Sequence, residues 1–232
     1  MFNFITGSDY RALIKDGVKN MVTDGADLVR ITAESFARQE IEGYLNFCYD
    51  VERILNFKVF DYADTDAYKA GDLVIDANGT KHVCVQTATA PADLDDANLF
   101  VKDDLQQRLN YDEEATYTKG QTIIDQDRAE YLCIQDAPAG TKLTDTSYFF
   151  LKRNDLIVML MVDISAYHYH ARINQRQVPV IRLDRYEDAV RKLKAIRKSE
   201  LQPPLPKICL TEDGEPQGVI LITSNKKRDN CW

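Results

Sequence analysis

The stretch TYTKGQTIIDQDRAEYLCIQ, residues 116–135, is a second version of AYKAGDLVIDANGTKHVCVQ, residues 67–86. The two stretches align without a gap at a constant offset of 49 residues, and the match continues outward on both sides. A tandem duplication is the simplest account of such a match. The repeated unit covers residues 62–104 and returns at residues 111–153.

Each unit contains two short apolar runs separated by a polar turn, which is the pattern of a β-hairpin. In the first unit, Asn78-Gly79 separates the runs. Asn-Gly can supply the two positive-φ positions of a tight turn, so we expect both residues to have positive φ. A calcium site is not indicated, because no ladder of alternating Asp ligands follows.

Charge separates the repeats from the rest of the chain. Residues 62–153 carry 9 basic and 17 acidic residues, whereas the flanks together carry 20 of each, so the net charge of -8 lies entirely in the repeats. An acidic surface is repelled by nucleic acid. We therefore expect the repeated units to project outward, away from any DNA.

The flanks of the repeats have the apolar periodicity of helices. Stripes with steps of three or four residues predict long helices at about residues 25–48, 156–171 and 182–199, the last of them burying Leu183. A shorter helix is expected before them, with Ser8 or Asp9 as its N-cap and an end near Gly17. Asp163 lies inside the second long helix and needs a partner, for which Arg185 is a candidate.

The last helix ends in a run of cations. Lys194, Arg197 and Lys198 complement the helix dipole, and they are also candidates to face DNA. The Pro-rich segment QPPLP then ends the helical region. Residues 219–223 form one strand-like run that needs a partner strand, which a neighbouring subunit or another protein could supply.

These patterns predict an α+β fold, in which two small all-β modules are inserted in tandem into a helix–helix loop. The expected domains are a discontinuous helical domain (residues 1–61 and 154–204), the modules at 62–104 and 111–153, and an extended arm at 205–232. Five cysteines without a C-x-x-C motif favour neither a disulfide framework nor a zinc site. The longest apolar run, LIVMLMV at residues 156–162, is too short to cross a membrane.

No sequence motif indicates an enzyme or a cofactor. The chain has no glycine-rich phosphate loop, no G-x-S-x-G and no H-E-x-x-H. An apolar content of 44% with 28% charged residues is typical of a globular protein with a real core. A binding or structural role is therefore expected.

Three phrases in the flanks resemble the Mu-like family of tailed-bacteriophage head completion proteins, also called head-tail connectors or adaptors. They are EIEGYL (residues 40–45), DISAYHYHAR (163–172) and DRYEDAVRKLKAIRK (184–198), and the tail SNKKRDNCW (224–232) is similar to the basic tail of that family. The resemblance implies a helical connector bundle in a homo-oligomeric ring of roughly twelve copies. Such a ring sits at the portal vertex of the virion, after assembly in the host cytoplasm, binds the portal and further tail or ring proteins, and lets DNA pass.

The repeated unit is similar to small chitin-type carbohydrate-binding modules, whose pattern YKAGDLV with HVC, and YTKGQTI with YLC, follow loosely. Tyrosines and phenylalanines replace the tryptophans that flank that pattern. The alternative function is therefore a carbohydrate-binding accessory protein that uses both repeats. Candidates for contacts made by the modules, with protein or glycan, are Tyr62, Tyr68, Tyr111 and Tyr117.

The arm carries the residues expected to dock on the portal or on a neighbouring subunit. An apolar strand would add main-chain hydrogen bonds, and the basic end with the chain's one tryptophan would add side-chain contacts. These residues are Val219, Ile220, Leu221, Ile222, Lys226, Lys227, Arg228 and Trp232.

Overall fold

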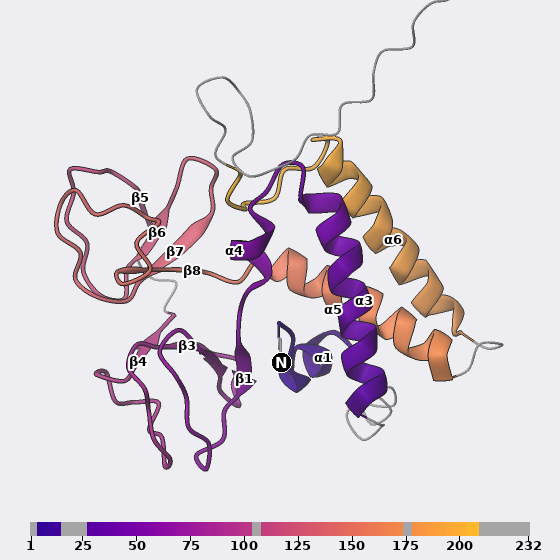
Figure 1. The fold of residues 1–232 in the computed structure, drawn as a ribbon, viewed down its shortest axis with the longest axis horizontal. Helices are drawn as coiled ribbons and strands as arrows, with labels where there is room; N and C mark the ends of the chain where they lie inside the picture. The colour runs from indigo at the N-terminus through magenta and orange to yellow at the C-terminus, as the bar shows by residue number, and fades with distance from the viewer. Residues whose placement is uncertain (1–3, 15–26, 104–107, 174–177, 209–232) are drawn as a thin grey trace, which may run out of the picture.

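The computed structural model describes residues 4–14, 27–103, 108–173 and 178–208, and within them the fold is mixed α+β (Figure 1). Five helices and two four-stranded sheets occupy these residues, with the sheets between the helices in sequence. The helices are α1 (Gly7–Leu13), α3 (Asp27–Leu45), α4 (Val51–Leu55), α5 (Asp155–Ile173) and α6 (Val180–Arg197). The strands are β1 (Val59–Asp61), β2 (Leu73–Ile75), β3 (Lys81–Cys84), β4 (Phe100–Lys102), β5 (Arg108–Asn110), β6 (Thr122–Ile124), β7 (Glu130–Cys133) and β8 (Phe149–Leu151).

The long helices α3, α5 and α6 pack against one another, with α3 in front of α5 in Figure 1. Helix α5 is buried on nearly every side, and Ile157, Leu160 and Ile164 have no exposed surface. Enclosure by its neighbours explains why a segment rich in β-branched residues is a helix: burial of its apolar side chains outweighs their weak helix propensity. The three long helices that the periodicity predicts are all present.

Two details of the predicted helices are wrong. Leu183 is 40% exposed, and Arg182 lies in the interior instead, because the buried stripe of α6 continues from Ala189 back to Arg182 in steps of three and four. Helix α1 is capped by Thr6, whose backbone N–H donates to the Asp9 carboxylate at 2.8 Å, so the N-cap precedes both residues that the sequence suggested. The expected end near Gly17 lies outside the described residues; α1 ends at Leu13.

The two sheets repeat one topology. In each sheet the first strand pairs parallel with the second. The second strand pairs antiparallel with the third, and the third with the fourth, so that the order is β1-β2-β3-β4 and again β5-β6-β7-β8. At the first hairpin turn only Gly79 has a positive φ (84°), so the expectation for Asn78 is wrong. The equivalent residue of the second turn is Arg128, whose φ of 65° is unusual for a side chain of its kind.

Each sheet begins before the repeat that the sequence reveals. Strand β1 ends at Asp61, within the segment assigned to the helical domain, and β5 lies between the two predicted modules. The side chains of these strands differ: Val59 is fully buried, whereas the equivalent Arg108 is exposed. Backbone pairing needs no side-chain similarity, so an alignment of residue types cannot detect these strands.

The two repeated units, which we call the β-units, each have a small hydrophobic core, and both also contribute to the main hydrophobic core of the protein. Inside each sheet, an aromatic cluster packs around Tyr68 or Tyr117. The opposite faces of the sheets contribute Val83, Val101 and Leu132 to the hydrophobic cluster that fills the helical body. The units lie to one side of the helices (Figure 1), but they are joined to them by a continuous core.

Candidate functional site

The three phrases that resemble the connector family meet at one junction of α3, α5 and α6. The Glu40 carboxylate lies 3.3 Å from Nε2 of His168 and accepts a 3.0 Å hydrogen bond from the Tyr186 hydroxyl. The hydrogen bond with His168 lowers the pKa of Glu40, so the carboxylate stays ionised. Burial, with the adjacent Glu40, raises the pKa of Tyr186 to about 12, so the phenol stays protonated.

A second set of contacts joins the same helices. The Tyr167 and Tyr186 rings stack with centroids 4.1 Å apart. Asp163 and Arg185 form an ion pair at 2.9 Å, which confirms the predicted partner. Burial raises the pKa of Asp163 despite the guanidinium beside it. Arg185 also donates to the carbonyl of Leu13, at 3.0 Å, and so ties the residue that ends α1 to this junction.

Polar groups at this junction are satisfied mainly by one another. The Glu40 contacts join segments more than a hundred residues apart in the chain, and the Asp163–Arg185 and Tyr167–Tyr186 contacts join α5 to α6, so each contact fixes the relative position of two helices. Such an arrangement holds a rigid helical unit together.

Tyr68 and Tyr117 are core residues of the β-units. They are 1% and 3% exposed. The Tyr68 hydroxyl accepts from the N–H of Ala63 (2.8 Å) and donates to its carbonyl (2.9 Å), and Tyr117 makes the same two contacts with Asp112. These rings organise the loop that follows β1 or β5, and neither presents a face to the surface.

Tyr62 and Tyr111 are half-buried beside them. Each ring stacks on its buried neighbour, with centroids 6.4 Å apart in the first unit and 6.3 Å in the second. Each hydroxyl donates to a backbone carbonyl, that of Ala92 at 2.7 Å and that of Thr141 at 3.0 Å. The structure therefore gives all four tyrosines a packing role, with part of Tyr62 and Tyr111 reaching the surface.

The cations at the end of α6 are exposed. Arg197 lies over the Phe47 ring, 4.8 Å from the guanidinium carbon to the ring centroid, and Lys198 is 4.0 Å from Glu200. Lys194, like them, is exposed. This end of α6 can therefore meet an anionic surface, whether nucleic acid or protein.

The predicted docking residues of the arm, from Val219 to Trp232, lie outside the described residues. The chain can be followed to Ile208, whose N–H donates to the carbonyl of Cys48 at 3.2 Å. Tyr49 and Lys207 form an isolated antiparallel bridge there. The arm thus leaves the described fold next to the end of α3.

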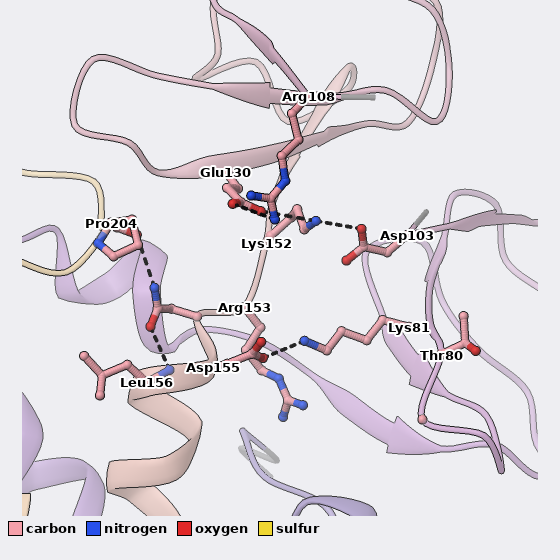
Figure 2. A pocket seen from close by; sticks show the side chains of 12 residues that line it. Thr80, Lys81, Asp103, Arg108, Glu130, Lys152, Arg153, Asp155, Leu156 and Pro204 are labelled. Carbon is pink, nitrogen blue, oxygen red and sulfur yellow. Dashed lines mark hydrogen bonds and ion pairs between the residues drawn. The ribbon is translucent and has the colours of Figure 1, made fainter. Parts of the chain in front are cut away.

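A charged cavity lies where the two β-units meet the start of α5 (Figure 2). The sequence analysis did not predict it. Its volume is about 580 Å³. Lys152 reaches across it to Asp103 of the first unit at 2.7 Å and contacts Glu130 of its own unit at 3.3 Å. Lys81 pairs with Asp155 at 2.7 Å.

The repeat explains this cavity. Asp103 and Lys152 stand at equivalent positions of the two units, and so do Lys81 and Glu130, each pair 49 residues apart with opposite charges. Inversion of charge lets two copies of one surface attract where identical copies would repel. Opposite charges at matched positions of the repeat were the sequence signal for this junction.

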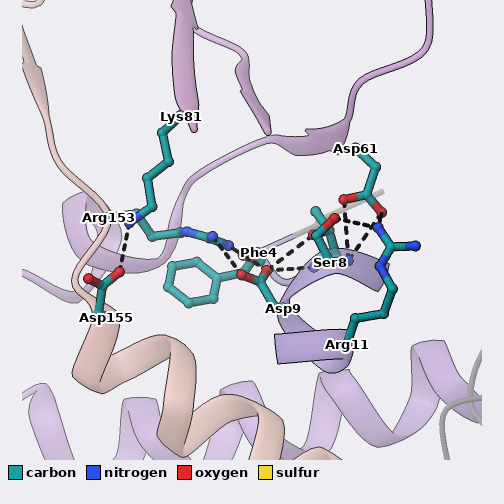
Figure 3. Close-up of polar contacts among 9 residues, drawn as sticks. Phe4, Ser8, Asp9, Arg11, Asp61, Lys81, Arg153 and Asp155 are labelled. Carbon is teal, nitrogen blue, oxygen red and sulfur yellow. Dashed lines mark hydrogen bonds and ion pairs between the residues drawn. The ribbon is translucent and has the colours of Figure 1, made fainter. Parts of the chain in front are cut away.

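A buried ion pair fixes the first described residues to the start of α5 (Figure 3). Arg153, with a side chain 1% exposed, donates to both oxygens of the Asp9 carboxylate at 2.8 Å and to the carbonyl of Phe4 at 2.6 Å. The same N-terminal turn of α1 also meets β1, where Asp61 accepts from the N–H of Ser8 at 3.3 Å. The N-terminal flank is thereby joined directly to the last residue of the second repeated unit, two residues before α5 begins.

The described residues contain neither a metal site nor a membrane-spanning helix. Within the described ranges, no group of three or more His, Cys, Asp or Glu side chains is placed to hold a metal ion. None of the helices in that part of the chain is both long and apolar enough to span a bilayer. No protein-family model and no curated protein sequence matches the chain.

Proposed function

We propose that the protein is a structural component of a tailed-phage virion, a head-tail connector subunit that joins the portal to the tail in a ring and lets DNA pass. The helical body would be a connector bundle with the β-units as insertions projecting outward for protein or glycan contacts. It would act by binding, without catalysis or a cofactor. The observation that supports this proposal is the junction of Glu40, His168 and Tyr186, which brings together the three phrases that resemble the connector family.

The contacts at this junction support the proposal, because residues of all three phrases take part in them. Residues from three separate phrases contact one another across 128 and 146 positions of the chain. The helical body also exposes large apolar side chains that a neighbouring subunit could cover, namely Phe36, Phe47, Val180 and Ile181.

Charge suggests an orientation for such a subunit. The acidic repeats would face away from the DNA, and the exposed cations Lys194, Arg197 and Lys198 would lie towards the channel. The arm would dock on the portal or an adjacent subunit through its strand-like run and its basic end.

Co-expression with the portal protein tests the proposal. Native mass spectrometry and electron-microscope class averages should show a closed ring attached to the portal, and monomers that do not bind the portal would refute it. Removal of residues 219–232 should abolish attachment. A matched variant that replaces residues 219–223 with a Gly-Ser segment of equal length separates the strand's contribution from that of the basic end.

A carbohydrate-binding role for the repeats is the second candidate, and one observation favours it. A cavity of about 420 Å³ lies between the two units, lined in part by the equivalent residues Gln86 and Gln135. Amide side chains suit sugar hydroxyls, but the inward position of Tyr68 and Tyr117 removes the aromatic platform on which sugars stack. Glycan-array binding that is lost in a Gln86→Ala/Gln135→Ala variant would support this candidate.

A further inference from the structure

Helix α3 exposes a strip without charge. It consists of Thr32, Phe36, Gln39 and Gly43 on one face of the helix, followed by Phe47 in the turn after it; we call these five residues the α3 strip. Phe36 is 42% and Phe47 56% exposed. Each position is about 100° from the next along a helix, so Phe36 and Gly43 lie within roughly 20° of each other.

Gly43 is unexplained by the fold of a single chain. A Cβ atom at this position would meet nothing within 4 Å, and the residue sits inside a regular helix without a positive φ. Glycine there destabilises the helix by about 0.5–1 kcal/mol relative to alanine. A notch between two exposed aromatic rings is the feature that allows another backbone to approach a helix closely.

The chain itself supplies a segment that can reach the strip. It leaves the described fold at Ile208, whose N–H donates to the carbonyl of Cys48, the neighbour of Phe47. Ten residues, 209–218, separate this point from Val219, and ten extended residues span up to about 33 Å. The helical distance from Phe47 back to Phe36 is only about 17 Å.

Charge also favours this occupant. The connecting residues include Glu212, Asp213 and Glu215 and no cation. Arg197 lies over Phe47 at one end of the strip, and Arg172 lies over Phe36 at 5.3 Å. An acidic connector would pass beside these guanidinium groups and bring an apolar run, Val219–Ile222, over an uncharged strip with two exposed phenylalanine rings.

We propose that Val219–Ile222 dock on the α3 strip of their own chain. Tethering gives the segment a local concentration of the order of millimolar, which favours the chain's own arm over a free partner. The docked arm is a resting state that a portal or neighbouring subunit would have to displace. This inference concerns the isolated chain, and it stands whether or not the protein forms a ring.

Hydrogen exchange of the full-length chain, followed by mass spectrometry, tests the docking. Backbone amides of residues 219–222 should exchange at least about tenfold more slowly than unstructured amides. Gly43→Lys should abolish this protection, because it fills the notch while improving helix propensity, so the helix itself remains folded. Gly43→Ala, which fills only part of the notch, should weaken the protection less than Gly43→Lys does.

Three outcomes would overturn the proposal. They are exchange of residues 219–222 at the unstructured rate in the wild type, equal protection in Gly43→Lys, and equal protection in Phe36→Ser, which removes apolar surface from a half-exposed position. Protection that disappears on hundredfold dilution would assign the strip to a second copy and overturn docking within one chain. Protection that is independent of concentration and lost in both variants would establish it.

Discussion

Removal of the buried charge at Asp9 should destabilise the protein strongly. Its carboxylate receives two 2.8 Å bonds from Arg153 and a third from the N–H of Thr6, and the Arg153 side chain is 1% exposed. Asp9→Asn leaves the guanidinium buried without a counter-charge, which costs about 3–5 kcal/mol. For a chain of this size, that corresponds to a fall in Tm of roughly 6–20 °C. Scanning calorimetry or urea unfolding followed by circular dichroism measures it.

An exposed ion pair of the same helix provides the control. Arg11 lies 3.7 Å from Asp61, and both side chains are more than a third exposed, so Arg11→Ala should cost at most about 1 kcal/mol. The double variant Asp9→Leu/Arg153→Met removes both buried charges and should recover most of the stability that Asp9→Asn loses. If Asp9→Asn costs no more than Arg11→Ala, the pair does not hold the N-terminal flank to the end of the second repeated unit and the reasoning is refuted.

Three further predictions use thermal unfolding. Burial, with a nearby arginine, lowers the pKa of His170, so the unfolded chain binds a proton at this residue at a higher pH than the folded chain does. Stability should therefore fall as the pH drops below about 6.5, and His170→Gln should reduce that loss. Gly79→Ala should lower the free energy of unfolding by about 1 kcal/mol because the φ of Gly79 is 84°, whereas Gly43→Ala should raise it by about 0.5–1 kcal/mol. Equal effects of the two substitutions on stability would contradict the backbone argument. Asp103→Lys should destabilise the junction of the β-units by about 2–3 kcal/mol, and adding Lys152→Met, which removes the repulsion between two lysines, should restore part of it. Additive losses would count against a specific pair.

Much of the fold was predictable because its signals are local. Apolar steps of three and four residues predicted α3, α5 and α6, and the repeat predicted two hairpins of one design. Even the partner of Asp163 followed, since a carboxylate inside a helix needs a cation and Arg185 lies on the next helix. The Thr6 cap and the exposed Leu183 were missed, because a shift of one residue at a helix end changes which side chains face inward.

The amino-acid sequence by itself determined the three long helices, the two hairpins and the duplication, because periodicity and turn chemistry act over a few residues. Only the tertiary structure decided how these elements meet. It placed Tyr68 and Tyr117 inside the β-units, joined Arg153 to Asp9 across 144 positions, and paired Lys152 with Asp103 between the two copies. Burial and long-range charge pairing depend on which surfaces come together in space, and no local pattern of residues contains that information.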